Sequence, residues 1–217
     1  MKKIAIISTK NPTDTILLTI ENLKKFYSDF EIVVIDSDSD NLQTLSKIPK
    51  DVTVHFIKNK NYELGAWYYA YETYPNYNFY LCIQDTLIPT KRIPSFDEKN
   101  LGVCYCIAWT KKIKLDSVNH GWFKRLHEIY ENTNLYKYLN KSVEDITYGA
   151  LHSSFLTDNN IMKNILQLEE VYIQNKIVKT KYDSCMSERS IAWIANEYAD
   201  KLCDVTNYFR KVHGRRA

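Results

Sequence analysis

Short apolar runs and amphipathic segments alternate along the first part of the chain. Apolar runs closed by polar or turn-forming residues predict strands at 3–8, 30–35, 52–57 and 79–83, and the first two are expected to be buried. Between them, residues 14–27 carry apolar positions at helical spacing, and residues 64–74 carry the small and aromatic residues of a second helix. Such alternation predicts an α/β fold with a mainly parallel, doubly wound sheet flanked by helices.

The alternation loosens beyond about residue 95. We expect the following elements there: strands at 101–109 and 150–156, helical pieces at 121–130, 135–139 and 159–168, a last helix at 187–198, and a basic tail at 210–216. No repeat, linker or shift in composition divides the chain. The sequence therefore predicts one domain over 1–217, with a nucleotide-binding type of first half (1–95) and a variable second half (96–217).

Polar side chains follow the ends of three predicted strands. Thr9 and Asn11 come after the first strand, Asp36 and Asp38 after the second, and Asp85 after the fourth. Ligands of doubly wound sheets bind at the carboxyl ends of the strands. We therefore expect these five side chains to converge on one crevice.

Composition and charge narrow the possible partners. The chain has 217 residues, 45% of them hydrophobic, and a net charge of +3 from 29 basic and 26 acidic side chains. This balance predicts neither a nucleic-acid coat nor a membrane surface. The first apolar run ends at Ser8, too early for a signal-peptide core, and no later run reaches the about 18 residues of a membrane span.

The cysteine pattern and the missing motifs exclude several classes. The five cysteines contain no CxxC pair, which favours reduced thiols in a cytoplasmic compartment. The sequence also lacks the glycine-rich P-loop and dinucleotide fingerprints, Gly-x-Ser-x-Gly and His-Glu-x-x-His. Their absence argues against a P-loop enzyme, a Rossmann dehydrogenase, an α/β hydrolase and a zinc protease.

Four segments, in order, resemble signatures of the GT-A nucleotide-diphospho-sugar transferases. Ile-Ile-Ser-Thr-Lys-Asn at 6–11 stands where that family has a strand and Pro-Thr-Tyr-Asn, and Asp-Ser-Asp-Ser-Asp-Asn at 36–41 where it has Asp-Asp-Gly-Ser-Thr-Asp-Asn. Residues 61–66 correspond to Asn-x-Gly-x-Gly-Ala, and residues 81–85 to a strand ending in Asp-x-Asp. The segments Glu-Leu-Gly-Ala-Trp at 63–67 and Ile-Gln-Asp at 83–85 are also similar to glycosyltransferase domains of large DNA viruses. In chlorella viruses such a domain attaches sugars to the capsid protein. A viral source would place the protein in the host cytoplasm.

The resemblance implies a sugar nucleotide as donor, with UDP expected as its nucleotide. Asp36 would then accept the uracil N–H, and Thr9 with the backbone of 8–11 would frame the base. As an alternative, Asp36 and Asp38 merely end a strand or cap a short helix near Asn41. The nucleotide-binding candidates are Ser8, Thr9, Asn11, Asp36, Asp38, Gly65, Lys211 and Arg215.

A Mn²⁺ or Mg²⁺ ion at the donor diphosphate is also implied by the resemblance. Such hard ions prefer carboxylate and phosphate oxygens. Asp85 and His213 are the expected protein ligands, although the family's first Asp is missing because residues 83–85 read Ile-Gln-Asp. The two Asp-x-Asp triplets within 36–40 follow the second strand and not the fourth, which argues against a metal site there.

Basic side chains offer a second way to neutralise the diphosphate if the ion is weakly held. The candidates are Lys211, Arg215 and Arg216, together with Lys58 or Lys60 after the third strand. As an alternative, Lys211, Arg215 and Arg216 form a solvated basic segment that binds no ligand.

A base that takes the acceptor proton is the remaining requirement of an inverting transferase. By resemblance, an acidic residue near a late helix supplies it, which selects Glu188 first and Asp183 second. As an alternative, Glu188 only serves the first turn of that helix. Trp122 and His152 are the candidates that contact the acceptor, although aromatic residues at such positions are commonly core residues.

The sequence therefore favours a metal-assisted, inverting glycosyltransferase that moves a sugar from a UDP-sugar to a hydroxyl of a glycan or glycoprotein. A degenerate module that binds nucleotide sugar or glycan without turnover is the alternative, since the first Asp is absent and Trp67, Tyr68 and Tyr69 stand where the family has an arginine. A nucleotidyltransferase would share the fold, but the chain lacks a glycine-rich, basic loop after its first strand. No nucleic-acid partner is expected.

Overall fold

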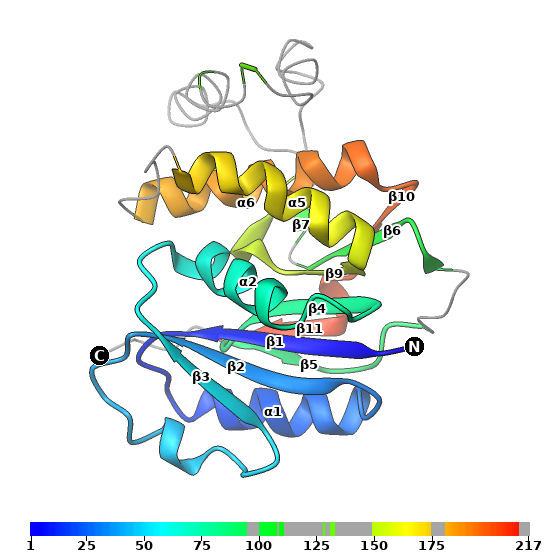
Figure 1. Ribbon diagram of the computed structural model, residues 1–217. Helices are drawn as coiled ribbons and strands as arrows, with labels where there is room; N and C mark the ends of the chain where they lie inside the picture. The colour runs from blue at the N-terminus through cyan, green and yellow to red at the C-terminus, as the bar shows by residue number, and fades with distance from the viewer. Residues whose placement is uncertain are drawn as a thin grey trace.

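The protein is built around a mixed, mainly parallel sheet (Figure 1). The computed structural model describes residues 1–94, 100–107, 109–110, 128, 131–132, 149–174 and 181–212. Seven strands form the sheet in the order β10-β6-β9-β4-β1-β2-β3. Only β9 runs antiparallel to its neighbours among these strands. The strands are β1 (Lys3–Thr9), β2 (Glu31–Ser37), β3 (Thr53–Ile57), β4 (Phe79–Gln84), β6 (Val103–Cys106), β9 (Phe155–Asp158) and β10 (Lys201–Asp204).

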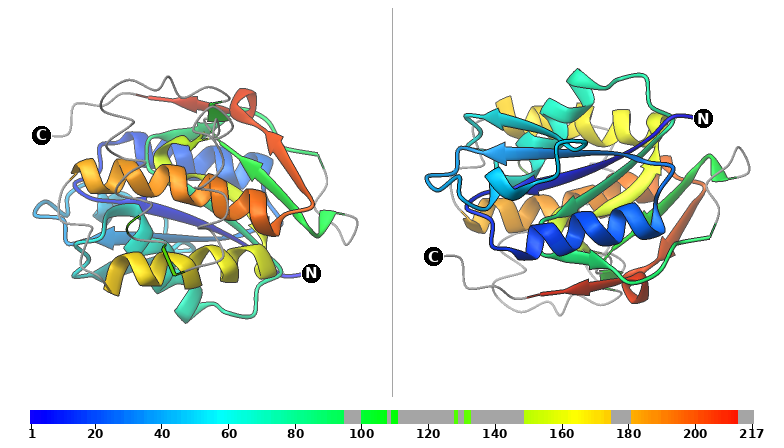
Figure 2. Two further views of the ribbon diagram at one scale, coloured as in Figure 1. Left: turned by 90° about the horizontal axis from the view of Figure 1, so that it is seen from above. Right: turned by 90° about the horizontal axis from the view of Figure 1, so that it is seen from below.

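Helices cover both faces of this sheet, as the views from above and below show (Figure 2). α1 (Thr15–Phe26) covers one face, while α2 (Tyr62–Thr73), α5 (Asn159–Gln174) and α6 (Lys181–Tyr198) cover the other. Side chains alternate along each strand, so Ile4 and Ile6 of β1 belong to the core under α2, and Ala5 and Ile7 to the core over α1. This two-sided burial explains why the first strands read as continuous apolar runs.

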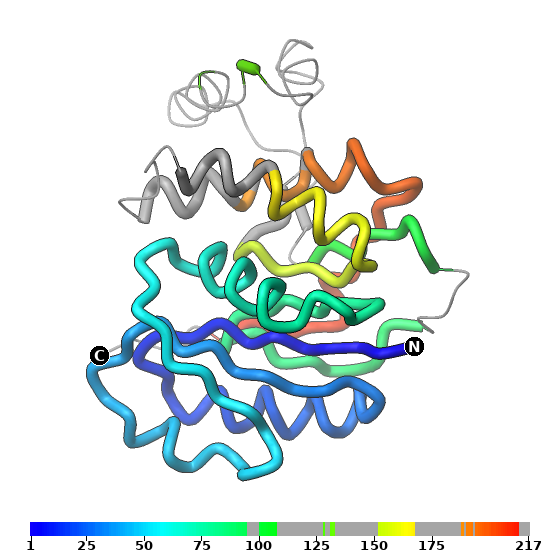
Figure 3. The backbone as a smooth tube through the Cα atoms, viewed as in Figure 1, coloured from blue at the N-terminus to red at the C-terminus, as the bar shows by residue number. Residues whose placement is uncertain are grey.

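Two small sheets and three single-turn helices complete the described fold. β5 (Leu87–Pro89) pairs antiparallel with β11 (Phe209–Lys211), and β7 (Trp109–Thr110) with β8 (Gly149–Ala150). The backbone trace shows β11 lying along β5 (Figure 3). The 3₁₀ helices are η1 (Leu45–Lys47), η4 (Leu151–Ser153) and η5 (Thr206–Tyr208).

Two of the strand predictions in the second half are wrong in their bounds. The expected strand at 101–109 is divided, because β6 ends at Cys106 and β7 belongs to a different sheet. The expected strand at 150–156 begins only at Phe155. His152 and Ser153 precede it with left-handed φ values of 63° and 48°, which a β-strand does not accommodate.

The late elements are longer or more regular than expected. α5 extends to Gln174, and α6 begins at Lys181 instead of residue 187. The prediction of a basic tail at 210–216 is wrong for residues 210–211, because these two residues belong to strand β11. The helical pieces expected at 121–130 and 135–139 lie outside the described residues, apart from residue 128.

Among the described residues, no helix combines the length and the apolar character that a membrane span requires. In the described part of the chain, Cys82, Cys104, Cys106 and Cys203 are thiols that form no disulfide. Burial raises the pKa of the Cys82 thiol, so this cysteine is an inert core residue.

Candidate functional site

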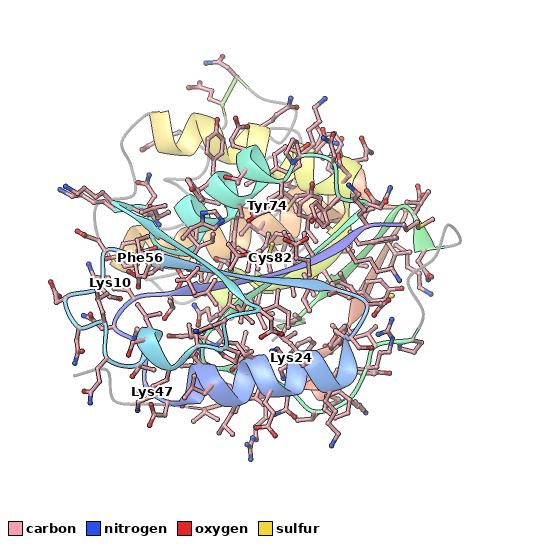
Figure 4. All side chains as sticks on the ribbon, turned by 60° about the horizontal axis from the view of Figure 1, so that its bottom comes forward. Lys10, Lys24, Lys47, Phe56, Tyr74 and Cys82 are labelled. Atoms are coloured by element: carbon pink, nitrogen blue, oxygen red, sulfur yellow. The ribbon has the colours of Figure 1, made fainter. Side chains whose placement is uncertain are left out.

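A cavity of about 360 Å³ opens where β1, β2 and β3 end and α2 begins. The strand order changes direction between β1 and β4, and the carboxyl ends of strands at such a point are the usual ligand site of an open α/β sheet. Lys10 projects from this edge of the molecule (Figure 4). The described lining consists of Ser8, Thr9, Lys10, Ser37, Asn59, Lys60, Tyr62 and Glu63.

Strand alternation explains which polar residues face the cavity. Ser8 follows Ile6 by two residues on β1, and Ser37 follows Ile35 by two on β2, so both serines lie on the α2 side of the sheet. Lys10 and Lys60 add two positive charges at the exposed rim, and Glu63 places one carboxylate, 8% exposed, in the wall. The cavity therefore offers hydroxyls and ammonium groups to a polar, anionic ligand.

Asn59 holds the cavity wall together and depends on Gly65. The Asn59 Nδ2 donates to Ser37 Oγ at 3.0 Å and to the Tyr62 carbonyl at 2.6 Å, while Asn59 Oδ1 accepts the Asn61 N–H at 2.8 Å. A Cβ atom added at Gly65 would lie 2.0 Å from Asn59 Oδ1. Gly65, expected to bind nucleotide, is absent from the described lining and instead leaves room for Asn59.

Thr9 and Asp85 meet at the ends of β1 and β4. The Thr9 hydroxyl donates to Asp85 Oδ2 at 2.6 Å, and Asp85 is 2% exposed. The Asp85 N–H donates to the Ser8 carbonyl at 3.1 Å, and the Asp85 carbonyl accepts the Thr19 hydroxyl at 2.9 Å. Backbone and side chain of Asp85 are thus fixed from β1 and α1.

Asp36 and Asn11 join the loops that follow β2 and β1. Asp36 is 1% exposed and accepts both the N–H of Ser39, at 3.0 Å, and the Ser39 hydroxyl. The Asn11 N–H donates to Ser39 Oγ at 2.6 Å, and Asn11 Oδ1 accepts the Asp40 N–H at 2.9 Å. Asp36 also lies opposite Thr9 in the strand register, so the structure brings Thr9, Asn11, Asp36 and Asp85 together at one edge. Asp38 lies in the same loop, exposed and with a φ of 62°.

Glu63, Gln84 and Lys211 form a hydrogen-bonded chain beside the cavity. Gln84 Nε2 donates to Glu63 Oε1 at 2.5 Å, and Lys211 Nζ donates to Gln84 Oε1 at 2.6 Å. Sequence reasoning missed Glu63 and Gln84 as partners of Lys211. The available signal was the place of Glu63 in the first turn of a helix that begins at the ligand edge of the sheet.

The described residues do not complete the expected metal site. Hard divalent ions require several oxygen ligands. Within the described ranges, no three His, Cys, Asp or Glu side chains gather at a place where they could hold a metal ion. Asp85 is buried and accepts the Thr9 hydroxyl, and His213 lies outside the described residues.

The candidates for catalysis and acceptor binding lie on the second half of the chain. Glu188 is 7% exposed and lies in the middle of α6, so its expected alternative role in a first helical turn is wrong. Asp183 occupies the first turn instead, and its side chain is outside the described part. His152 lies in η4, just before β9, whose start pairs with the end of β4. Trp122, Arg215 and Arg216 are outside the described residues.

The corner that carries His152 is tied to the first half of the chain. The Trp67 indole N–H, on α2, donates to the Ser153 carbonyl at 3.1 Å, and Trp67 is fully buried. Because β9 is antiparallel to β4, this corner lies at the same edge of the sheet as the ends of β1 and β4. The acceptor candidate and the donor candidates therefore share one edge.

Comparison with known proteins identifies the fold. No protein-family model matches the chain, and no curated protein matches it. A solved structure of core-mannan synthase A from Aspergillus fumigatus, in a form with Mn and GDP, is similar with a TM-score of 0.60. The match has 9% sequence identity and covers 98% of this chain and 75% of that one. Together with the mixed sheet and its flanking helices, this similarity shows that the chain has a GT-A type, Rossmann-like fold.

Proposed function

We propose that this protein is a glycosyltransferase that uses a nucleotide-diphosphate sugar, with UDP as the nucleotide, and transfers the sugar to a hydroxyl of a glycan or glycoprotein. The observation that carries the proposal is the cavity with hydroxyls and lysines at the carboxyl ends of the strands of a GT-A type sheet. A sugar nucleotide presents hydroxyls and a diphosphate, which such a lining matches. The similar mannan synthase structure, crystallised with Mn and GDP, supports the same ligand class.

The donor is proposed to lie across the ends of β1 and β2. Lys10 and Lys60 are placed to attract the diphosphate, and Ser8 and Ser37 to hydrogen-bond it. Asp36 does not line the cavity and is 1% exposed, with its carboxylate accepting two hydrogen bonds from Ser39, so a contact between Asp36 and the uracil N–H stays a prediction from the resemblance.

Transfer is proposed to occur with inversion, with Glu188 as the base. The acceptor oxygen forms a bond to the anomeric carbon while the bond from that carbon to the phosphate oxygen breaks, and the nucleoside diphosphate leaves with the electron pair. Glu188 takes the acceptor proton, and Asp183 is the second candidate. His152 is proposed to contact the acceptor, since η4 lies at the edge where β4 ends.

The first test measures ligand binding by thermal unfolding with UDP, GDP and UMP. Binding only to the native state raises the unfolding temperature. A rise with UDP or GDP that is lost in the Lys10→Met/Lys60→Met double variant supports the proposed cavity. Lys24→Met is a matched control, because Lys24 lies on α1 and pairs with Asp51 at the surface (Figure 4). No rise with any nucleotide would exclude the proposed function.

The second test measures turnover as hydrolysis of a panel of nucleotide sugars. Release of sugar from one donor, abolished together with binding in the double lysine variant, supports an enzyme. Binding of nucleotide without turnover of any donor, also with glycan acceptors present, would contradict the transferase and leave a binding module.

A further inference from the structure

Asn59 makes three hydrogen bonds that leave its side-chain amide one orientation. The amide nitrogen donates to the Tyr62 carbonyl at 2.6 Å and to Ser37 Oγ at 3.0 Å, and the amide oxygen accepts the Asn61 N–H at 2.8 Å. Exchanging the oxygen and the nitrogen would set two acceptors together at Tyr62 and two donors together at Asn61. The backbone of residues 61–62 therefore fixes which end of the Asn59 amide faces Ser37.

This fixed amide determines how the Ser37 hydroxyl is oriented. Ser37 Oγ accepts a hydrogen from Asn59, so its own hydrogen has to point to a different atom, which must be an acceptor. In the described part of the chain Asn59 is the hydrogen-bond partner of this hydroxyl, and it is a donor. Ser37 is 5% exposed and lines the cavity. Its hydroxyl is therefore a buried donor that takes its acceptor from the contents of the cavity.

Ser8 lines the same cavity without such an orienting partner. It is buried at the end of β1, on the same face of the sheet as Ser37. Among the described residues its hydroxyl has no hydrogen-bond partner, so it can rotate and either donate or accept. The two serines thus present the same group to the cavity, and Asn59 orients only Ser37.

A hydroxyl held as a donor suits one part of the proposed ligand. The diphosphate of a sugar nucleotide carries charged acceptor oxygens, and a hydrogen bond to a charged oxygen is stronger than one to a neutral oxygen. A ribose hydroxyl both donates and accepts, so it can bind a serine hydroxyl of either orientation. Lys10 and Lys60 bring two positive charges to the rim of the same cavity. Ser37 is therefore assigned to the diphosphate.

We infer that Asn59 is a positioning residue for the donor, because it holds the Ser37 hydroxyl as a hydrogen-bond donor to the diphosphate. The inference rests on the proposed function and deepens it. Both hydrogens of the Asn59 amide nitrogen are used, one by Ser37 and one by the Tyr62 carbonyl, so Asn59 acts on the ligand through Ser37. A hydroxyl that already points at the ligand loses less rotational freedom on binding, which strengthens the complex.

A double-mutant cycle in UDP binding, measured by calorimetric titration of the full chain, tests this inference. Ser37→Ala removes the proposed donor and should weaken UDP binding by about tenfold. Asn59→Ala should weaken UDP binding several-fold in the wild-type background and leave it unchanged in the Ser37→Ala background, because its effect passes through the Ser37 hydroxyl. Uridine lacks phosphates and should bind all four proteins equally well.

Ser8 provides the matched control for this coupling. In a second cycle, Asn59→Ala should weaken UDP binding by the same factor in the Ser8→Ala background as in wild type, since Asn59 does not orient Ser8. An effect of Asn59→Ala that is equally large with and without the Ser37 hydroxyl would show that Asn59 only supports the loop, and would overturn the inference. An equal loss of uridine and UDP binding in Ser37→Ala would also overturn it, because the hydroxyl would then serve the nucleoside.

Gly65→Ala takes the place of Asn59→Ala in the cycle if the latter does not fold. The added Cβ would lie 2.0 Å from Asn59 Oδ1, so this variant displaces the amide without removing it, and the same dependence on Ser37 is expected. Failure of the proposed function has a different signature, because wild type would then bind neither UDP nor GDP. That result would remove the inference together with the function on which it rests.

Discussion

Thr9 and Asp85, from neighbouring strands, share a 2.6 Å hydrogen bond from the threonine hydroxyl to the buried carboxylate. Replacing Thr9 with valine keeps the shape and removes this donor. We expect Thr9→Val to lower the free energy of unfolding by about 1–3 kcal/mol, the cost of a buried acceptor without its partner. Urea unfolding measures this, and Thr9→Ser, which retains the hydroxyl, is the control. Equal stability of the two variants would contradict the prediction.

The contact between Gly65 and Asn59 predicts the sign of the stability change in Gly65→Ala. In an ordinary helix interior, Gly→Ala stabilises by about 1 kcal/mol. Here the new Cβ would lie 2.0 Å from Asn59 Oδ1, so Gly65→Ala should destabilise by about 1–3 kcal/mol and weaken nucleotide binding. In the Asn59→Ala/Gly65→Ala double variant, thermal unfolding should show the ordinary stabilising sign relative to Asn59→Ala alone. A stabilising Gly65→Ala single variant would contradict the contact.

The lowered pKa of Asp29 predicts that the free energy of unfolding decreases in acid. Hydrogen bonds from Arg92, opposed in part by burial and supported by Lys3, hold the pKa of the Asp29 carboxyl well below its ordinary value. Because the folded-state pKa is lowered, the contribution is present above the unfolded pKa of about 4 and is lost as pH falls below it. The side chain is 39% exposed, so the contribution should stay below about 1 kcal/mol.

The measurement compares wild type with Asp29→Asn in urea unfolding at several pH values. Wild type should be the more stable protein at neutral pH, and the difference should shrink as the pH decreases from about 4 toward 2. A difference that is independent of pH would show that the ion pair does not set the pKa of Asp29.

The proposed role of Glu188 as the base predicts a variant that loses turnover and retains nucleotide binding. Glu188→Gln removes the base and keeps the size of the side chain, so turnover should fall by about 100-fold or more while UDP affinity is unchanged. Glu197→Gln, on the same helix, is the control. Full turnover in Glu188→Gln, with loss in Asp183→Asn, would assign the base to Asp183 instead.

β1, β2 and β4 were predictable because each is buried on both faces and ends in polar residues, whereas β3, at the edge of the sheet, has half-buried and exposed side chains. The fold class and the convergence of Thr9, Asn11, Asp36 and Asp85 followed from that pattern, since parallel strands end at one edge. The helix that carries Glu188 was also predicted, although it begins at Lys181 and not at residue 187.

The partners of Lys211 were not predictable. β11 and β5 have three residues each, too few for a periodic pattern, and they are far apart in the sequence. Lys211 was recognised as a basic candidate, but its contact with Gln84 depends on that pairing. In the same way, the role of Gly65 depends on Asn59, which only the folded loop brings against it.

The short β7–β8 ribbon has an evolutionary consequence. Thr110 pairs with Gly149, so two positions that are far apart in the sequence lie side by side. The length of sequence between them can therefore change without moving the two points at which it joins the described fold. Replacing that sequence would leave every strand of the seven-stranded sheet uncut. It would also leave unchanged the described residues that line the cavity beside β1, β2 and β3.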